Sequence, residues 1–204
     1  MRRDSQPKTG RDRGQAHVLE GIAAALLVLT SVIFALQVTA VTPLTASTAN
    51  QHLQTQGSGT ASGLLAAADE RGTLRETVLY WNETGNRFHD SGDSAQYAAV
   101  VPTEFGSTLE AAFRDRGMVY NVNLLYLSAD QTQRERKLLH QGDPSDHAVS
   151  VTRTVVLYDD DRLRDENETP SNRTVSDADS YFARDTADGP LYNVIRVEVV
   201  VWRV

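Results

Sequence analysis

The chain has 204 residues, no cysteine, 40 % hydrophobic residues and a formal net charge of −7. Its length is that of one ordinary domain, and without cysteine it has no disulfide, thiolate metal site, iron–sulfur cluster or cysteine nucleophile. The surplus of acidic residues argues against a nucleic acid as partner. No two of the five histidines have the spacing that places both imidazoles on one helical face, so we expect no metal and no cofactor.

The choice of charged residues is unusual, because 18 of the 20 basic residues are arginine and 17 of the 27 acidic residues are aspartate. An acidic surface that is poor in lysine suits concentrated salt, where the Debye length shrinks to about 3 Å at 1 M and repulsion between carboxylates is screened. We interpret the composition as that of a halophile's protein. A codon bias toward arginine is the alternative interpretation.

A basic leader precedes a long apolar run at the start of the chain. Residues 1–14 carry five basic and two acidic side chains, and Gly21–Val41 contains no charge over 21 residues. As a helix this run would be about 31 Å long, roughly the thickness of the hydrocarbon layer of a bilayer. Basic residues before the span predict a cytoplasmic N-terminus and an exterior C-terminal part. The chain therefore divides into a cytoplasmic leader (1–15), a transmembrane helix with a polar extension (16–56) and an exterior head (57–204).

Three fates of the span remain open. Val38-Thr39-Ala40 fits cleavage by a signal peptidase after Ala40, which would release a secreted soluble protein. Without cleavage the span would anchor a single-span surface protein whose head binds an envelope partner. A cut on the cytoplasmic side, after the basic leader, would retain the helix together with Glu20, a carboxylate at the entrance of the span.

The stretch RGQAHVLEGIAAALLVLTSVIFALQ resembles the class III leader and helix of archaeal type IV pilin-like proteins, particularly haloarchaeal ones. The resemblance implies that a prepilin peptidase cuts after Gly14, that Gln15 becomes the new N-terminus, and that Glu20 pairs with the terminal amine of a neighbouring subunit. A cut after Gln15 would instead make Glu20 the fifth residue of the mature chain, which is its usual position in the family. The resemblance also implies a membrane location and contacts with other pilin-like subunits through the N-terminal helix.

Small residues follow Glu20 and would let two such helices approach closely. We expect lateral contacts through four of them, which are Gly21, Ala23, Ala24 and Ala25.

After the span, the helical signals become shorter. Pro43 predicts a kink or break, and Gly57-Ser58-Gly59 predicts a hinge. A short amphipathic helix is expected over Gly63–Arg71, ended by Gly72, and helical spacing continues to Asn82.

Thr103–Arg116 is the clearest helix of the head. Thr103 would cap it, Gly117 would stop it, and four residues share its apolar face, which are Phe105, Leu109, Ala112 and Phe113.

The C-terminal half changes to the two-residue period of strands. We expect strands at 118–128 and 134–140, a third whose inward row is Val149, Val151, Val155 and Leu157 with Arg153 as the exception, and a last one from Leu191 to the end. The acidic segment 159–189 is predicted to be a loop. The predicted fold class is α+β, with a long N-terminal helix and an antiparallel β-meander whose apolar face is covered by the helix 103–116.

Three sequons support an exterior, glycosylated head. Their asparagines are Asn82, Asn167 and Asn172, and two of them lie in the acidic loop. Asparagine-rich turns are the alternative interpretation.

Other candidate sites are weaker. The cluster Asp159-Asp160-Asp161 lacks the glycine and the terminal glutamate of a calcium loop, and we interpret it as a solvated loop. The neighbours His89 and Asp90 are accompanied by no serine in a nucleophile-elbow sequence. We therefore expect no enzyme, but a structural or adhesive surface protein.

Overall fold

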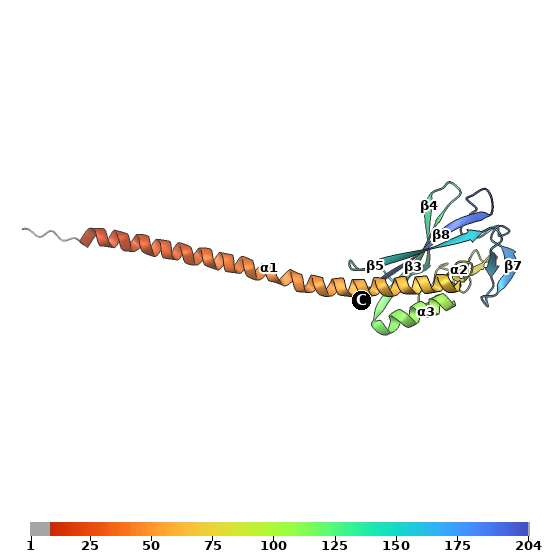
Figure 1. Ribbon diagram of the computed structural model, residues 1–204, viewed down its shortest axis with the longest axis horizontal. Helices are drawn as coiled ribbons and strands as arrows, with labels where there is room; N and C mark the ends of the chain where they lie inside the picture. Colours follow the sequence, from red (N-terminus) through yellow and green to blue (C-terminus); the bar gives the residue numbers. More distant parts are fainter. Residues whose placement is uncertain (1–8, 204) are drawn as a thin grey trace, which may run out of the picture. The chain divides into compact units, whose positions relative to one another are not determined.

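The structure is a computed structural model that describes the backbone of residues 9–203 and the side chains of 17–35 and 54–203. Its element order is one very long helix, a short helix and hairpin, a ten-residue helix, and strands to the C-terminus (Figure 1). Contacts divide the chain into two units, residues 1–50 and 51–204. The fold class is α+β, as predicted.

Helix α1 (Thr9–Arg71) continues through Pro43 and through Gly57-Ser58-Gly59, so no break occurs at Pro43 and the predicted hinge is wrong. A proline removes one hydrogen bond from a helix, and a long helix accommodates this without ending. Gly57 has a packing role, because a Cβ on it would lie 3.0 Å from Met118 Cε. The predicted end of the helix is confirmed, since Gly72 follows with φ 80°.

The helices of the head bury one continuous apolar surface. The last turns of α1 contribute Ala61, Leu65 and Ala68, which are spaced for one helical face. Helix α2 (Thr73–Val78) ends earlier than the predicted Asn82, because Tyr80 leaves the helix and Trp81 begins a strand.

Helix α3 (Glu104–Phe113) confirms the predicted helix. The Thr103 hydroxyl accepts a hydrogen bond from the Gly106 N–H at 3.3 Å, and Gly117 ends the following turn η1 (Arg114–Arg116) with φ 62°. Its buried face includes Phe105, Leu109 and Phe113, as predicted.

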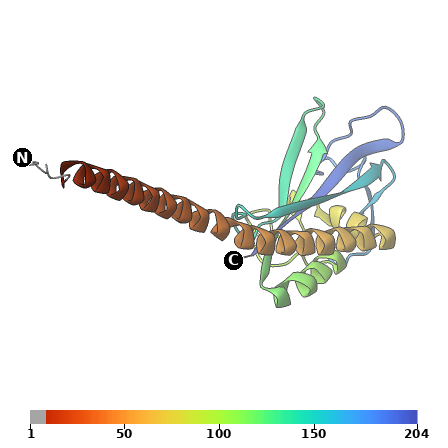
Figure 2. The same cartoon turned by 60° about the vertical axis from the view of Figure 1, so that its left-hand side comes forward.

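The main sheet has four antiparallel strands in the order β4-β3-β8-β5. Their bounds are β3 (Met118–Leu127), β4 (Gln133–Leu139), β5 (Val149–Tyr158) and β8 (Leu191–Arg203), close to the predicted ranges. The end of α1 and helix α3 lie on the same side of this sheet (Figures 1 and 2). Arg153 on β5 faces α1, where its guanidinium donates to Asp69 Oδ2 at 2.8 and 2.9 Å.

The predicted meander is wrong, because β8 lies between β3 and β5 instead of at an edge. Strand β8 is apolar along most of its thirteen residues, and a central position buries it best. The exposed, charged stretch of β4 suits an edge.

Two small hairpins were not predicted. Strands β1 (Trp81–Asn82) and β2 (Arg87–Phe88) form one, and β6 (Arg162–Arg164) and β7 (Pro170–Thr174) form the other within the predicted loop.

Candidate functional site

The apolar segment of α1 is the first candidate site. His17–Ala35 is the one stretch of the described residues that is long and apolar enough to cross a membrane, and none of it is buried. Its hydroxyl groups bond back to the helix, since Thr30 Oγ1 donates to the Leu26 carbonyl and Ser31 Oγ to the Val28 carbonyl. No water is therefore needed to satisfy these side chains, which suits a hydrocarbon environment.

The predicted assembly residues lie in this segment and are exposed. Glu20 has an ionisable neighbour in its own helix, because His17 Nδ1 lies 3.6 Å from Glu20 Oε2. Space is open beside Gly21, where a Cβ would have no heavy atom within 4 Å, and Ala24 is exposed. Gly14 and Gln15, the predicted processing residues, lie outside the residues whose side chains the structure describes.

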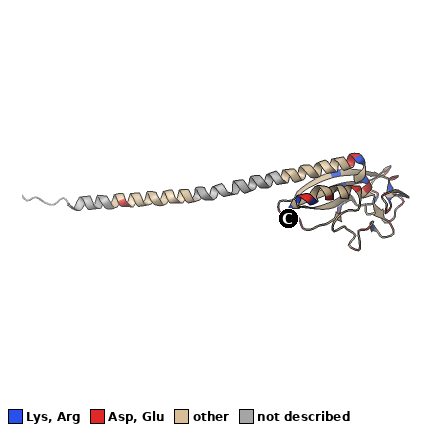
Figure 3. Cartoon of the chain, turned by 90° about the horizontal axis from the view of Figure 1, so that it is seen from below, with Lys and Arg blue, Asp and Glu red and all other residues tan. Residues whose placement is uncertain are grey.

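Charged residues are frequent in the head, whereas the described apolar segment contains one acidic residue, Glu20, and no lysine or arginine (Figure 3). The segment 17–35 is therefore apolar and unburied within its own unit, whereas the head carries charged residues that suit contact with water. Among the described side chains, no three His, Asp or Glu residues lie together in a way that could hold a metal ion.

The sequons differ in accessibility. Asn167 and Asn172 are exposed, but Asn82 is half-buried and its Oδ1 accepts a hydrogen bond from the Gly85 N–H at 2.8 Å. The hydroxyl groups of two sequon threonines are also engaged, Thr169 with Asp165 Oδ2 at 2.7 Å and Thr174 with Asp177 Oδ2 at 2.8 Å.

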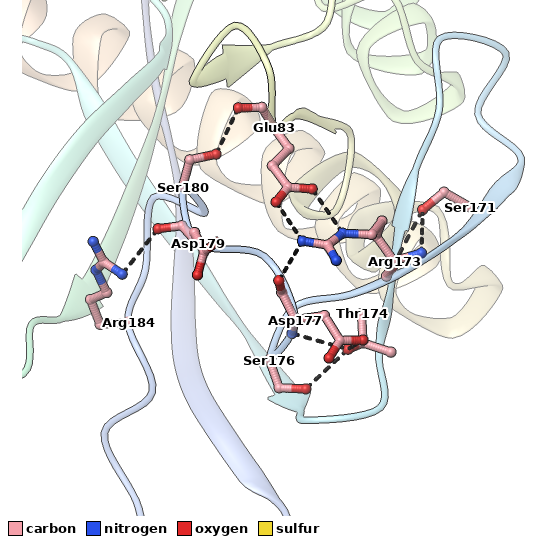
Figure 4. A network of polar contacts seen from close by, with 9 residues as sticks. All are labelled: Glu83, Ser171, Arg173, Thr174, Ser176, Asp177, Asp179, Ser180 and Arg184. Carbon is pink, nitrogen blue, oxygen red and sulfur yellow. Dashed lines mark hydrogen bonds and ion pairs between the residues drawn. The ribbon is translucent and has the colours of Figure 1, made fainter.

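An ion pair brings two of the sequons together, and the sequence alone did not indicate it. Glu83 follows Asn82 and Arg173 follows Asn172, and their side chains meet at 2.7 and 3.0 Å (Figure 4). The hydrogen bond from the Arg173 guanidinium lowers the pKa of Glu83 below its ordinary value. Ser180 Oγ donates to the Glu83 carbonyl at 2.8 Å and ties the following segment to the same place. The pair joins the β1–β2 turn to β7.

An aromatic cluster with one arginine fills the space beside this surface. The Arg136 guanidinium lies over the Trp81 ring, 4.7 Å from its centroid, and Phe88 and Phe182 pack around the same ring. Burial lowers the pKa of Arg136. The cluster belongs to the hydrophobic core, since Trp81 is 2 % exposed and Phe88 is fully buried.

His89 and Asp90 serve structural roles. His89 Nε2 lies 3.1 Å from the Arg164 carbonyl, and Asp90 accepts from the Tyr80 hydroxyl at 3.3 Å. Their side chains thus hold loops to the core.

Comparison with known proteins gives one match. The sequence profile of a family of unknown function (DUF7288) matches residues 13–201. No curated protein and no solved structure matches the chain.

Proposed function

The chain belongs to the family of unknown function DUF7288, and we propose that it is a membrane-anchored, exterior-facing and non-catalytic pilin-like subunit or accessory of an archaeal type IV pilus-like surface structure. The observation that carries the proposal is the exposed apolar segment His17–Ala35, which belongs to the same helix as the buried turns of the head. A helix of this design joins an apolar environment to a folded exterior domain.

The carboxylate of Glu20 supports the proposal further. A charge at the entrance of an apolar span is costly unless it is paired or reaches the interface. In an assembly of such helices, the terminal amine of a processed neighbour would neutralise it. His17, at 3.6 Å, is the neighbour that Glu20 has within its own chain.

The mature N-terminus tests the processing step. Terminal-peptide mass spectrometry on membrane and medium fractions of a host with native processing should find a start at Gln15 or Ala16. A start near Met1 would contradict processing and support a plain single-span anchor whose head binds an envelope partner. A start at Val41 in the medium would support a secreted soluble protein.

The role of Glu20 is tested by Glu20→Gln, with Glu70→Gln as matched control, because Glu70 is an exposed glutamate at the other end of the same helix. We expect unchanged membrane insertion for both variants. Loss of one charge-assisted contact of 1.4 kcal/mol or more should lower recovery of Glu20→Gln in sheared filaments by about tenfold. Equal recovery of the two variants would contradict the role of Glu20.

A further inference from the structure

The edge strand β5 exposes a short row of unpaired backbone groups. Two contacts show which groups point away from β8: Arg75 Nη2 donates to the Val156 carbonyl at 2.7 Å, and the Tyr158 N–H donates to Asp161 Oδ2 at 2.8 Å. The pairing of β5 with β8 is regular from Val149 to Leu157. Since outward groups alternate along an antiparallel strand, the other outward residues of β5 are Ser150, Thr152 and Thr154.

These three residues form an open edge, which we call the β5 window (Ser150, Thr152 and Thr154). All three are exposed, and within the described chain nothing bonds to their outward N–H or C=O groups. The window contains no lysine and no proline, and Arg153 is turned toward α1 by its contacts with Asp69. Natural edge strands usually carry such protections, and an edge without them pairs readily with another strand.

The opposite edge of the sheet, β4, is closed at one end and open at the other. Tyr97 closes one end, because its N–H donates to the Leu138 carbonyl at 2.8 Å and its carbonyl accepts from the His140 N–H at 2.9 Å. On the neighbouring strand β3, the N–H of Leu127 donates to Asn193 Oδ1 of β8 at 3.4 Å, and the Leu127 carbonyl accepts from Asn193 Nδ2 at 2.8 Å.

That contact fixes the direction of the remaining β4 groups. Because Leu127 faces β8, the alternate residues Leu124 and Tyr126 face β4, where they pair with Arg136 and Arg134. The outward residues of β4 are therefore those between, Gln133, Glu135 and Lys137, which are exposed and form the β4 window. Lys137 protects this edge against most strands, so a strand that pairs here must bring an acidic group beside it.

The two windows match in strand direction and in the face of the sheet on which their side chains lie. In the order β4-β3-β8-β5 every pairing is antiparallel, so β4 and β5 run in opposite directions. A second copy in the same orientation thus brings its β4 antiparallel to β5. The register places Glu135, Leu125, Arg196 and Thr154 in one row across the sheet, so both windows project side chains on the same face.

We propose that the β5 window of one copy pairs with the β4 window of a second copy and continues the sheet from head to head. Thr152 lies opposite Glu135, with Ser150 opposite Lys137 and Thr154 opposite Gln133. This register brings Lys137 beside Glu198, whose carboxylate accepts from Ser150 Oγ at 2.6 Å. The contact is heterologous and repeats along a row of subunits. It rests on the proposed function in that the copies share one membrane.

Disulfide trapping tests this pairing, because the chain has no cysteine of its own. The full-length variant with both Thr152→Cys and Glu135→Cys is expressed in host membranes and oxidised. Within one chain the two positions are three strand spacings apart, about 14 Å, which exceeds the reach of a disulfide. We expect a ladder of dimers, trimers and larger species on a non-reducing gel, and mainly monomer for each single variant.

Other band patterns overturn the pairing. Monomer alone in the double variant means that the windows do not meet. Dimers of Thr152→Cys alone, as abundant as those of the double variant, mean that β5 pairs with β5.

A backbone variant separates hydrogen bonding from mere proximity. Thr152→Pro removes an outward N–H, which an edge strand tolerates, whereas Thr152→Val keeps it. With cysteines at Thr154 and Gln133, we expect Thr152→Pro to reduce the ladder by about tenfold and Thr152→Val to retain it. A full ladder with Thr152→Pro overturns the pairing, and the first comparison decides alone where this variant does not fold.

Failure of this inference and failure of the proposed function give different results. Protein recovered in filaments without a ladder contradicts the edge pairing alone. A ladder in membranes without any protein in filaments contradicts the pilus subunit and leaves the pairing intact.

Discussion

Glu83 and Arg173 each occupy the middle position of a sequon, and their side chains form a two-pronged ion pair at 2.7 and 3.0 Å. The pair ties the β1–β2 turn to β7 although ninety residues separate Glu83 and Arg173 in the chain.

Stability should depend on this pair in a particular pH range. The pKa of Glu83 is lowered in the folded chain by the Arg173 hydrogen bond, so its contribution is present above the ordinary glutamate pKa and is lost as the pH falls through the lowered value. A double-mutant cycle of Glu83→Gln and Arg173→Gln in chemical denaturation should give favourable coupling at neutral pH and none in acid. Coupling that persists in acid would contradict the pairing, and added salt should weaken it.

Glycan occupancy should differ among the three sequons. Asn167 and Asn172 are exposed, whereas the Asn82 amide is half-buried and bonded to Gly85. In protein from a glycosylating host, intact-mass measurements should lose one glycan with Asn167→Gln and one with Asn172→Gln. Asn82→Gln should leave the mass of the glycans unchanged, and a loss there would show that the turn opens before modification.

Gly106 should be intolerant of any side chain. A Cβ at this position would lie 2.1 Å from the Val101 carbonyl oxygen, which is backbone and has little freedom to move. Gly106→Ala should lower the free energy of unfolding by about 1–3 kcal/mol, the usual cost of overpacking. Gly63→Ala is the matched control, because nothing lies within 4 Å of a Cβ there; it should stabilise the helix by about 0.5–1 kcal/mol. Equal effects of the two variants in denaturant melts would contradict the close contact.

Alkaline unfolding should follow the buried tyrosines. Burial and the neighbouring Asp90 raise the pKa of Tyr80 to about 12, and burial raises that of Tyr192 to about 12. Both phenols stay neutral when folded, so their contribution is complete below pH 10 and is lost as the pH rises toward 12. Phenolate absorbance and circular dichroism should therefore change together in that range. Tyr80→Phe should make unfolding less dependent on pH there, and an unchanged dependence would exclude Tyr80 as a cause.

Local signals predicted the single elements of the head well. Thr103 and Gly117 bound helix α3 as cap and stop, and the alternation of β3, β5 and β8 gave strands at nearly the observed ranges. Both kinds of signal depend on residues close in sequence, which explains their success.

The order of the strands in the sheet could not be predicted from such local signals. The meander followed from assuming that successive strands are neighbours, but the long connection between β5 and β8 lets β8 enter the middle of the sheet. The β1–β2 hairpin pairs only two residues on each side, and it exists because Trp81 and Phe88 pack on Phe182 from a distant segment. The ion pair between Glu83 and Arg173 has no local signature at all.

The apolar segment was predicted from composition, and the structure adds that none of its described side chains is buried. The sequence also pointed to Glu20, Gly21 and Ala24. The structure shows all three exposed, as contacts with neighbouring helices would require.

Arg75 has a consequence for how the head behaves at high ionic strength. In concentrated salt, repulsion between charges extends only about 3 Å and does little to prevent the edge strands of two molecules from pairing. A guanidinium bonded to the Val156 carbonyl and to Asp161 occupies the backbone acceptor itself, which blocks it sterically as well as by charge. Replacing Arg75 would free the outward Val156 carbonyl and lengthen the open edge of β5, so the side chain limits how much of this edge another strand can reach.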